Sequence, residues 1–525
     1  MRILYYGIII FFTVSQIFTQ SKFELAVGSL SMEEGRSIIQ DYDGGFVSAG
    51  VILSGQNHIY IVKISAAGQL LWTKTISGAS NDEAYSIIRT RDSGYAVTGY
   101  TNSFGAGSTD MIVIKLTNTG SVQWTKTFGG PNGDDGFSIL QNPDGSFIVG
   151  GSGTFGSTVS LIIKLSENGD LLWSKTASTG PGGSRIYSII RTIDGGYAFT
   201  GCGNNGVNVT RLDSTGSLIW SSIYKVSLYL DYGKSIIQSA DSGFVVTGIA
   251  TTGFNGRCDY YLIKFSKNGT IEWNRNYGFA YTTDVAAQVF PARDGGYFVA
   301  GGSDFLLGNN VDVHIVKYSA AGEVLWGRFI GQSALDAVYS AVKTSDNGYA
   351  LAGATRSFGA GNQDLYILKL DSIWNTCGNY RDTLEGSNGP LGEFTPHTTT
   401  VISQNLTITD PTLVIGSTGS LTMNCSITGM QNNPGDIPDK FSLKQNYPNP
   451  FNPVTSISFS IQERSAVTVT IYNSTGLQIS QLINAELSAG PYNIEWNASE
   501  FASGVYFCRM RAGGFTFTQK MVLLK

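Results

Sequence analysis

The sequence predicts an all-β fold: a seven-bladed β-propeller closed by an N-terminal strand, then a small β connector and a C-terminal Ig-like β-sandwich. Three observations lead to this prediction. Glycine accounts for 65 of 525 residues and aromatics for 12%, a composition typical of strands joined by tight turns. One motif recurs seven times before residue 350. Alternating strand-like runs fill the last 80 or so residues, as a compact sandwich requires.

The first element is a signal peptide, expected at residues 1–20 with a cut between 15 and 20. "MRILYYGIIIFFTVSQ" has one early arginine and an apolar core from Ile3 to Val14, which is too short to anchor in a bilayer. No other segment reaches about 18 apolar residues, so we expect no transmembrane anchor in the mature chain. With 14% charged residues and a net charge of -5, the chain offers no basic field for nucleic acid.

The propeller is predicted at residues 21–374. An Asp-x-Gly/Ser-Tyr/Phe motif follows an apolar run such as "YSIIRT" and precedes one such as "YAVTGYT", so it joins two strands through a turn. A third strand ends in Lys or Arg, and a fourth opens on Trp. Four strands per repeat are typical of propeller blades. The motif begins at Asp43, Asp92, Asp144, Asp194, Asp241, Asp294 and Asp346.

The spacing also predicts how the ring closes. In six repeats a Trp follows the third-strand cation by nine residues, but after Lys369 the chain reaches Trp374 in five. Phe23 stands 20 residues before Asp43, as Trp72 stands 20 before Asp92. The mature N-terminus should therefore supply the outer strand of the last blade. The blades resemble repeats of exported bacterial seven-bladed propellers in "DGGY", "SFGAG" and "IVIKL", over about residues 23–371.

Two sets of polar residues recur at equivalent positions in the repeats, and each set is here called a column. The third-strand cations are predicted to pack their stems beside Trp with the charge at the edge. Ten residues before each turn Asp lies a mostly acidic column, which could form a carboxylate ring at one mouth of the channel and attract calcium. The alternative is that each carboxylate accepts backbone N–H bonds in its own turn, as expected of a residue that serves every blade. The column is Glu33, Asp82, Asp134, Ser184, Asp231, Asp284 and Asp336.

Long loops before the third strand suggest a ligand-binding rim. Blades two, five, six and seven have these loops, each with an Asp five residues before the cation, and the last three are contiguous around the ring. Aromatic and polar side chains there would suit a glycan or a peptide. The alternative is that the loops only cap blade ends. The candidate ligand-binding residues are Phe254, Arg257, Asp259, Phe305, Asp312, Phe358 and Asp364.

No catalytic or metal-binding motif emerges. The three histidines, His58, His314 and His397, fall in no H-E-x-x-H pattern, and the chain has no G-x-S-x-G elbow or P-loop. His314 lies within a strand, where a packed or surface histidine is expected. Adjacent carboxylates such as Asp134 and Asp135 do not define the spacing that glycoside hydrolysis needs. We predict no enzyme, no metal site and no cofactor, with calcium left open.

The connector and linker are expected at residues 375–440, where short strand-like runs mix with Pro and Gly. Export permits disulfides, and five cysteines are present. Cys377 and Cys425 flank the connector and are the pair we predict. Cys202, Cys258 and Cys508 are expected to be isolated thiols.

Residues 441–525 resemble the C-terminal sorting domain of type IX secretion cargo in Bacteroidetes and relatives. The resemblance rests on "NYPNPFNP", the "IYNSTG" hairpin, "SGVY" and the terminal "QKMVLLK", with Cys508 where the pattern usually has an aromatic or apolar residue. It implies export to the periplasm, recognition by the type IX secretion machinery, and removal of the domain with release or lipopolysaccharide attachment. The implied sorting signal comprises Tyr447, Pro448, Asn449, Pro450, Phe451, Gly504, Tyr506 and Lys520.

Together these features predict an exported binding or scaffold module, secreted or attached to the outer-membrane surface. A second hypothesis is an extracellular hydrolase or lyase that acts on polysaccharide or peptide at the propeller rim. A third is an adhesin that binds through its Thr- and Gly-rich outer surfaces. Carboxylates clustered with a His or Tyr in one pocket would favour the enzyme, and a pocket without them would favour binding.

Overall fold

The computed structural model describes residues 20–524 with short gaps. The described chain divides into two compact units, Lys22–Ser426 and one containing Ile427–Lys525. Between 383 and 440 the strands are described by their backbone alone. The predicted signal peptide and most of its cut region therefore lie outside the described residues. The gaps are 181–182, 226–230, 252–257, 279–282, 304–310, 332–333, 378–379, 384–392, 396–399, 404–406, 410–413, 417–419, 431–440, 447, 488–489 and 499–500.

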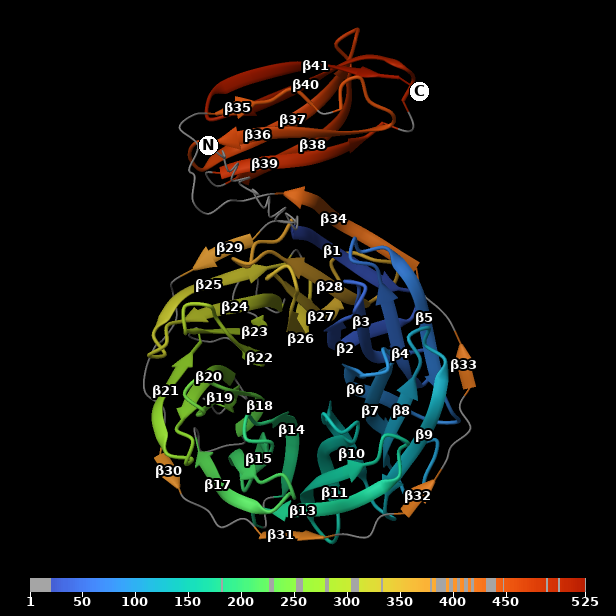
Figure 1. Cartoon of the computed structure of the whole chain (residues 1–525), viewed down its shortest axis with the longest axis vertical. Helices are drawn as coiled ribbons and strands as arrows, with labels where there is room; N and C mark the ends of the chain where they lie inside the picture. Colours follow the sequence, from blue (N-terminus) through green and yellow to red (C-terminus); the bar gives the residue numbers. More distant parts are fainter. Residues whose placement is uncertain are drawn as a thin grey trace, which may run out of the picture. The chain divides into compact units, whose positions relative to one another are not determined.

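In the larger unit, the described residues form seven sheets that follow one another around a ring in a propeller-like arrangement (Figure 1). Every described regular element is a β-strand, and neighbours within a sheet are antiparallel. The innermost strands are β2 (Met32–Gln40), β6 (Asp82–Arg89), β10 (Asp134–Gln141), β14 (Ser184–Arg191), β18 (Asp231–Gln238), β22 (Asp284–Pro291) and β26 (Asp336–Lys343). The second strands are β3 (Phe46–Leu53), β7 (Tyr95–Thr101), β11 (Phe147–Thr154), β15 (Tyr197–Gly203), β19 (Phe244–Thr251), β23 (Tyr297–Ser303) and β27 (Tyr349–Thr355).

Two further strands complete each sheet toward the outside of the ring. The third strands are β4 (Asn57–Ile64), β8 (Asp110–Leu116), β12 (Thr158–Leu165), β16 (Gly206–Leu212), β20 (Cys258–Phe265), β24 (Asp312–Tyr318) and β28 (Asp364–Leu370). The fourth strands are β5 (Leu70–Ser77), β9 (Val122–Gly129), β13 (Leu171–Ser178), β17 (Leu218–Lys225), β21 (Ile271–Tyr277), β25 (Val324–Ile330) and, in the last sheet, β1 (Gln20–Gly28).

Each innermost strand contains a β-bulge. In β6 the register to β7 shifts between Ala84 and Ser86, which leaves Tyr85 as an extra residue. The bulge brings the Glu83 carbonyl against Gly99 of β7, where an added Cβ would lie 1.8 Å from that oxygen. Only glycine fits such an approach. The same contact recurs at Gly50, Gly151, Gly201, Gly248, Gly301 and Gly353.

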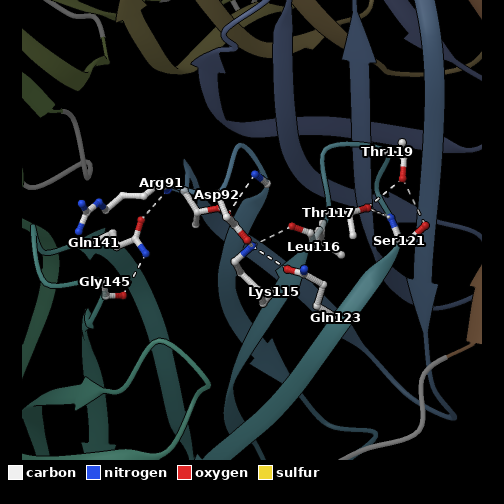
Figure 2. Close-up of polar contacts among 12 residues, drawn as sticks. Arg91, Asp92, Lys115, Leu116, Thr117, Thr119, Ser121, Gln123, Gln141 and Gly145 are labelled. Atoms are coloured by element: carbon white, nitrogen blue, oxygen red, sulfur yellow. Dashed lines mark hydrogen bonds and ion pairs between the residues drawn. The ribbon is translucent and has the colours of Figure 1, made fainter.

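The turn after each innermost strand is fixed by an ion pair. Asp92 accepts a hydrogen bond from the Gly94 N–H at 3.2 Å, and its carboxylate lies 2.7 Å from Nζ of Lys115 (Figure 2). Lys115 is 3% exposed, so the prediction that the charge of these cations lies at the edge is wrong. The equivalent pairs are Lys63–Asp43, Lys164–Asp144, Arg211–Asp194, Lys264–Asp241, Lys317–Asp294 and Lys369–Asp346.

The N-terminal strand closes the ring as the spacing predicts. β1 pairs with β28 in a register that sets Phe23 opposite Lys369. The buried Phe23 ring packs 6.0 Å from Phe46 in the next sheet. Fourth-strand Trp residues make the same contact with the next sheet, so Phe23 occupies a Trp position. These contacts are Trp72–Tyr95, Trp124–Phe147, Trp220–Phe244 and Trp273–Tyr297.

The segment predicted as a small β connector runs around the outside of the ring, where its strands pair with the sheets of the larger unit. Six strands over residues 380–430, here called the strap, each add to a fourth strand (Figure 1). From β29 to β33 the strap meets these sheets in the reverse of their chain order, and β34 then joins the last sheet. The outer edge of a fourth strand has free backbone groups that can pair with a further strand. The strap has polar sequence and no core of its own, and this pairing explains why it is held on the sheets. The strands are β29 (Tyr380–Thr383) on β25, β30 (Glu393–Thr395) on β17, β31 (Thr400–Ser403) on β13, β32 (Thr407–Thr409) on β9, β33 (Val414–Gly416) on β5 and β34 (Ser420–Met430) on β1.

The smaller unit is two sheets around one hydrophobic core. A three-stranded sheet contributes Ile457, Phe459 and Trp496, and a four-stranded sheet contributes residues such as Val469 and Met510. The Tyr506 hydroxyl donates to the Ala502 carbonyl at 2.6 Å. The strands are β35 (Ser442–Leu443), β36 (Val454–Ile461) and β39 (Gly490–Asn497), then β38 (Gln478–Leu487), β37 (Ser465–Asn473), β40 (Gly504–Ala512) and β41 (Phe515–Leu523).

Candidate functional site

The acidic column lies at the start of the innermost strands, and its members serve their own connections. Asp82 accepts hydrogen bonds from the Gly78 N–H at 2.9 Å and from the Ser103 hydroxyl at 2.7 Å. Asp134 accepts from the Gly130 N–H at 2.8 Å, and Glu33 from the Ser29 N–H at 3.1 Å. All seven residues of the column are at most 2% exposed. The alternative of a local role therefore holds for these three carboxylates, because they face backbone N–H groups.

The rim residues predicted on the long loops are only partly described. Phe254, Arg257 and Phe305 lie outside the described residues. Asp364 is 1% exposed, and its carboxylate accepts the Gly361 N–H at 3.2 Å; burial raises its pKa. Phe358 is half-buried, with its ring 5.6 Å from that of Tyr366.

The other two rim aspartates begin their third strands. Asp312, 5% exposed, starts β24, and Asp259 follows the first residue of β20. Asp110, the equivalent residue of the second sheet, shows the local use, since it accepts N–H bonds from Ala106 and Gly107 at 3.1 Å. Of these aspartates, Asp110 and Asp364 thus hold their loops in place rather than reach solvent.

The bulge residues of neighbouring innermost strands contact one another along the centre of the ring. The ring of Phe137 lies 4.9 Å from that of Tyr85 and 5.2 Å from that of Tyr187. Arg36 covers one end of this row, 4.8 Å from the Tyr85 centroid, and Lys234 the other, 4.4 Å from the Tyr187 centroid. Arg36 also pairs with Glu83. The row thus forms a packed inner wall across neighbouring sheets and their bulges.

A different site lies at the opposite ends of these strands. An open depression of about 420 Å³ is found where β6, β10 and β14 end. Its lining includes three arginines and no carboxylate or histidine, although the whole chain has a net charge of -5. The lining residues are Tyr42, Ile88, Arg89, Thr90, Arg91, Leu140, Gln141, Asn142, Pro143 and Arg191.

Two arginines of this depression, Arg89 and Arg91, are held by neutral groups. The Arg89 guanidinium lies 3.7 Å from the centroid of the exposed Tyr42 ring and donates to the Gln40 carbonyl at 3.3 Å. Arg91 donates to the Pro143 carbonyl, and its backbone N–H donates to Oε1 of Gln141 at 2.9 Å (Figure 2). Where the structure describes arginine–carboxylate ion pairs, they involve Arg36, Arg211, Arg275 and Arg328 instead.

The nearby turn carboxylates are already engaged. Asp92 pairs with Lys115, Asp144 with Lys164, and Asp194 with Arg211. Figure 2 shows Asp92 facing Lys115 while Arg91 extends the other way, beside Gln141. The depression is therefore electropositive, and guanidinium groups of this kind suit carboxylate and phosphate oxygens.

Loop length did not point to these arginines, but another repeated position does. The last residues of the innermost strands are Gln40, Arg89, Gln141, Arg191, Gln238, Pro291 and Lys343. The glutamines reach the turn of the preceding sheet, as Gln40 does to the Ser345 N–H at 2.7 Å and Gln238 to the Ile193 N–H at 2.8 Å. Arginine stands in place of glutamine at two of these positions, Arg89 and Arg191. This difference between repeats is the sequence signal that points to the depression.

The sorting-signal residues bind the two ends of the smaller unit together. Asn449 accepts the Val522 N–H at 2.8 Å and donates to the Lys520 carbonyl at 3.1 Å. The Pro448 carbonyl accepts the Thr455 hydroxyl at 2.8 Å. The Phe451 backbone exchanges hydrogen bonds with Val522 and Leu524. The opening motif and the last strand thus form one structural element, which explains why they occur together.

The remaining sorting-signal residues have varied positions. Phe451 and Tyr506 are buried, with their rings near Trp496 at 5.5 and 5.4 Å. Pro450 follows a cis peptide bond. Gly504 opens β40 opposite Leu523, and the Lys520 side chain is exposed. Tyr447 lies outside the described residues.

The histidines and cysteines have structural surroundings where they are described. His314 is fully buried and stacked 4.2 Å from the Phe329 ring, and burial lowers its pKa to about 3, so it is a packed residue. His397 lies outside the described residues. Cys377 is disulfide-bonded, whereas Cys202, Cys258 and Cys508 form no disulfide. The Cys425 side chain is not described.

The described residues contain no helix with the length and hydrophobicity that a membrane span requires. Within the same residues, no three His, Cys, Asp or Glu side chains are grouped to hold a metal ion. Calcium binding stays a prediction.

Comparison with known families assigns the smaller unit. Residues 445–524 match the family described as the secretion system C-terminal sorting domain. The chain carries a C-terminal sorting domain. This domain implies interaction with the type IX secretion machinery, and secretion or attachment at the outer-membrane surface.

Likeness to other proteins is remote. Regulatory protein FlaEY of Caulobacter vibrioides is 25% identical over 122 residues, which cover 21% of this chain and 13% of FlaEY. The structure of PorZ, a surface component of the type IX secretion system of Porphyromonas gingivalis, is 15% identical with a TM-score of 0.39, and the match covers 91% of this chain and 64% of PorZ. Drosophila Plexin A, solved with Semaphorin 1b, is 10% identical with a TM-score of 0.33 and coverages of 66% and 88%.

Proposed function

We propose that the protein is a type IX secretion cargo in which a seven-bladed β-propeller acts as a binding or scaffold module at the cell surface or outside. The match of residues 445–524 to the sorting-domain family carries this proposal. The two-sheet unit with its Tyr506 to Ala502 hydrogen bond is consistent with an Ig-like sandwich. The depression lined by arginines, without a carboxylate or histidine, supports binding rather than hydrolysis there.

Deletion of residues 441–525 tests the export route. The strap ends at Met430, so the deletion leaves every described strand of the larger unit in place, and trapping would report sorting rather than unfolding. We expect the truncated protein to accumulate in the periplasm, measured by fractionation and surface labelling. The full-length chain with Lys343→Gln is the control, because Lys343 lies outside the smaller unit. Normal surface display of the truncated chain would contradict the proposal.

A further inference from the structure

The arginine-lined depression has the chemistry of an anion-binding site. Its three guanidinium groups lie on two innermost strands and one turn, with no acidic side chain among the lining residues. The three turn aspartates nearby pair with other cations. From this arrangement we propose that the depression formed by Tyr42, Arg89, Arg91, Gln141 and Arg191 binds an acidic saccharide. This inference rests on the proposed binding role and names the ligand class.

Arg89 and Arg91 are positioned before any ligand arrives. Stacking on Tyr42 restricts the Arg89 guanidinium, and the Pro143 carbonyl restricts that of Arg91. Positioning of this kind reduces the entropy that binding costs. A guanidinium has five N–H donors, so each retains donors beyond those used within the protein. A planar carboxylate can accept two parallel hydrogen bonds from the guanidinium N–H groups that remain unused.

The neutral lining favours a sugar over a bare anion. Tyr42 is 60% exposed and offers an aromatic surface beside Arg89, as expected for a group with an apolar face and polar edges. Gln141 is fixed by its bonds to Arg91 and to the Gly145 carbonyl at 3.0 Å, whereas Asn142 is buried and bonds Ser146 and Tyr197. A volume of about 420 Å³ lies within the range of small-molecule sites.

The test is calorimetric titration of the full mature chain with tetragalacturonate and with its methyl ester, which removes the charge but keeps the sugars. We expect the acid form to bind at least about tenfold more tightly than the ester. Arg89→Gln and Arg191→Gln should each weaken binding of the acid form by about tenfold. These changes suit the fold, because glutamine occupies the same strand position at Gln40, Gln141 and Gln238. Lys343→Gln is the matched control, since it changes the same position in a sheet outside the depression.

Each outcome decides the proposal. Loss of binding in the two arginine variants, with Lys343→Gln unaffected, would support it. Equal affinity for acid and ester, unchanged affinity in the variants, or no binding by the wild-type chain would overturn it. If inorganic phosphate alone binds as tightly as the tetrasaccharide, the site takes a simple anion and the saccharide part is wrong. None of these results depends on export, so the periplasmic-trapping experiment stands or fails separately.

Discussion

At the level of single residues, one difference between sheets has a measurable effect. In the second and last sheets, the buried aspartate of the acidic column also accepts a threonine hydroxyl, from Thr101 to Asp82 and from Thr355 to Asp336. Asp134 has Gly153 at that position, which supplies no hydroxyl. Burial raises the pKa of Asp134 to about 6, and the charges of Asp110 and Asp135 add to this effect.

Asp134→Asn should therefore change stability in a pH-dependent way. Between pH 3.8 and about 6, folded Asp134 keeps a proton that the unfolded chain has lost, so the free energy of unfolding falls as pH rises through this range. At pH 7.5 we expect the variant to be more stable than the wild type by on the order of 1 kcal/mol, with the gain absent at pH 4. Urea denaturation at the two pH values measures it.

Asp82→Asn provides the contrast. Its carboxylate accepts bonds from Gly78, Ser103 and Thr101, so the substitution should destabilise the protein at pH 7.5 by about 1 to 2 kcal/mol. A stability difference between Asp134→Asn and the wild type that does not vary with pH would show that the raised pKa of Asp134 has no such effect.

At the level of elements, the bulge and its facing glycine are one device. The bulge supplies the extra inward residue, such as Tyr85, and requires a second-strand residue without a side chain, such as Gly99. Gly99→Ala would place a Cβ 1.8 Å from the Glu83 carbonyl. We expect a loss of about 2 to 3 kcal/mol, measured as a lower Tm. Gly130→Ala is the control. Its added Cβ would lie 4.0 Å from the nearest heavy atom, so this variant should change stability by less than about 0.5 kcal/mol. Equal melting of both variants would show that the bulge yields easily.

The sequence predicts some elements better than others, for physical reasons. Turns fixed by Asp92 and Gly94, and the outer strand that begins near Phe23, follow from spacing because each repeat needs them. The bulge at Tyr85 adds one residue without changing the repeat length, so the spacing between repeats does not reveal it. Strap strands such as Thr407–Thr409 are three residues long, too short for an alternating pattern. The candidate depression joins Tyr42 to Arg191, and only the ring brings such distant residues together.

At the level of the whole molecule, the ring is held closed by the two ends of the larger unit. β1 completes the last sheet, and the strap then pairs with fourth strands of five other sheets before β34 joins β1. The strap is anchored where it begins. Arg328, which is 8% exposed, makes a bidentate ion pair with Asp382 of β29 and donates to the Trp374 carbonyl at 3.0 Å. Trp374 is itself buried against Tyr349, with centroids 3.8 Å apart.

The disulfide of Cys377 therefore lies where the strap departs from the last sheet. The strap returns to that sheet through β34, which contains Cys425. A bond between these two cysteines, as predicted, would make the strap a covalent loop around the ring. Cross-links over loops of this length restrict the unfolded chain and stabilise by about 2 to 4 kcal/mol. We expect Cys377→Ser to lower Tm and to expose the strap to proteolysis.

The pairing is decided by a double-mutant comparison. If Cys377 bonds Cys425, then Cys377→Ser, Cys425→Ser and the double variant should lose the same stability, because each removes the same bond. Cys202→Ser, at a free thiol, should leave strap cleavage unchanged. A larger loss in the double variant than in either single one would mean that the two cysteines act separately. The strap would then be closed around the ring by β-pairing and the Arg328 anchor rather than by a bond between these two cysteines.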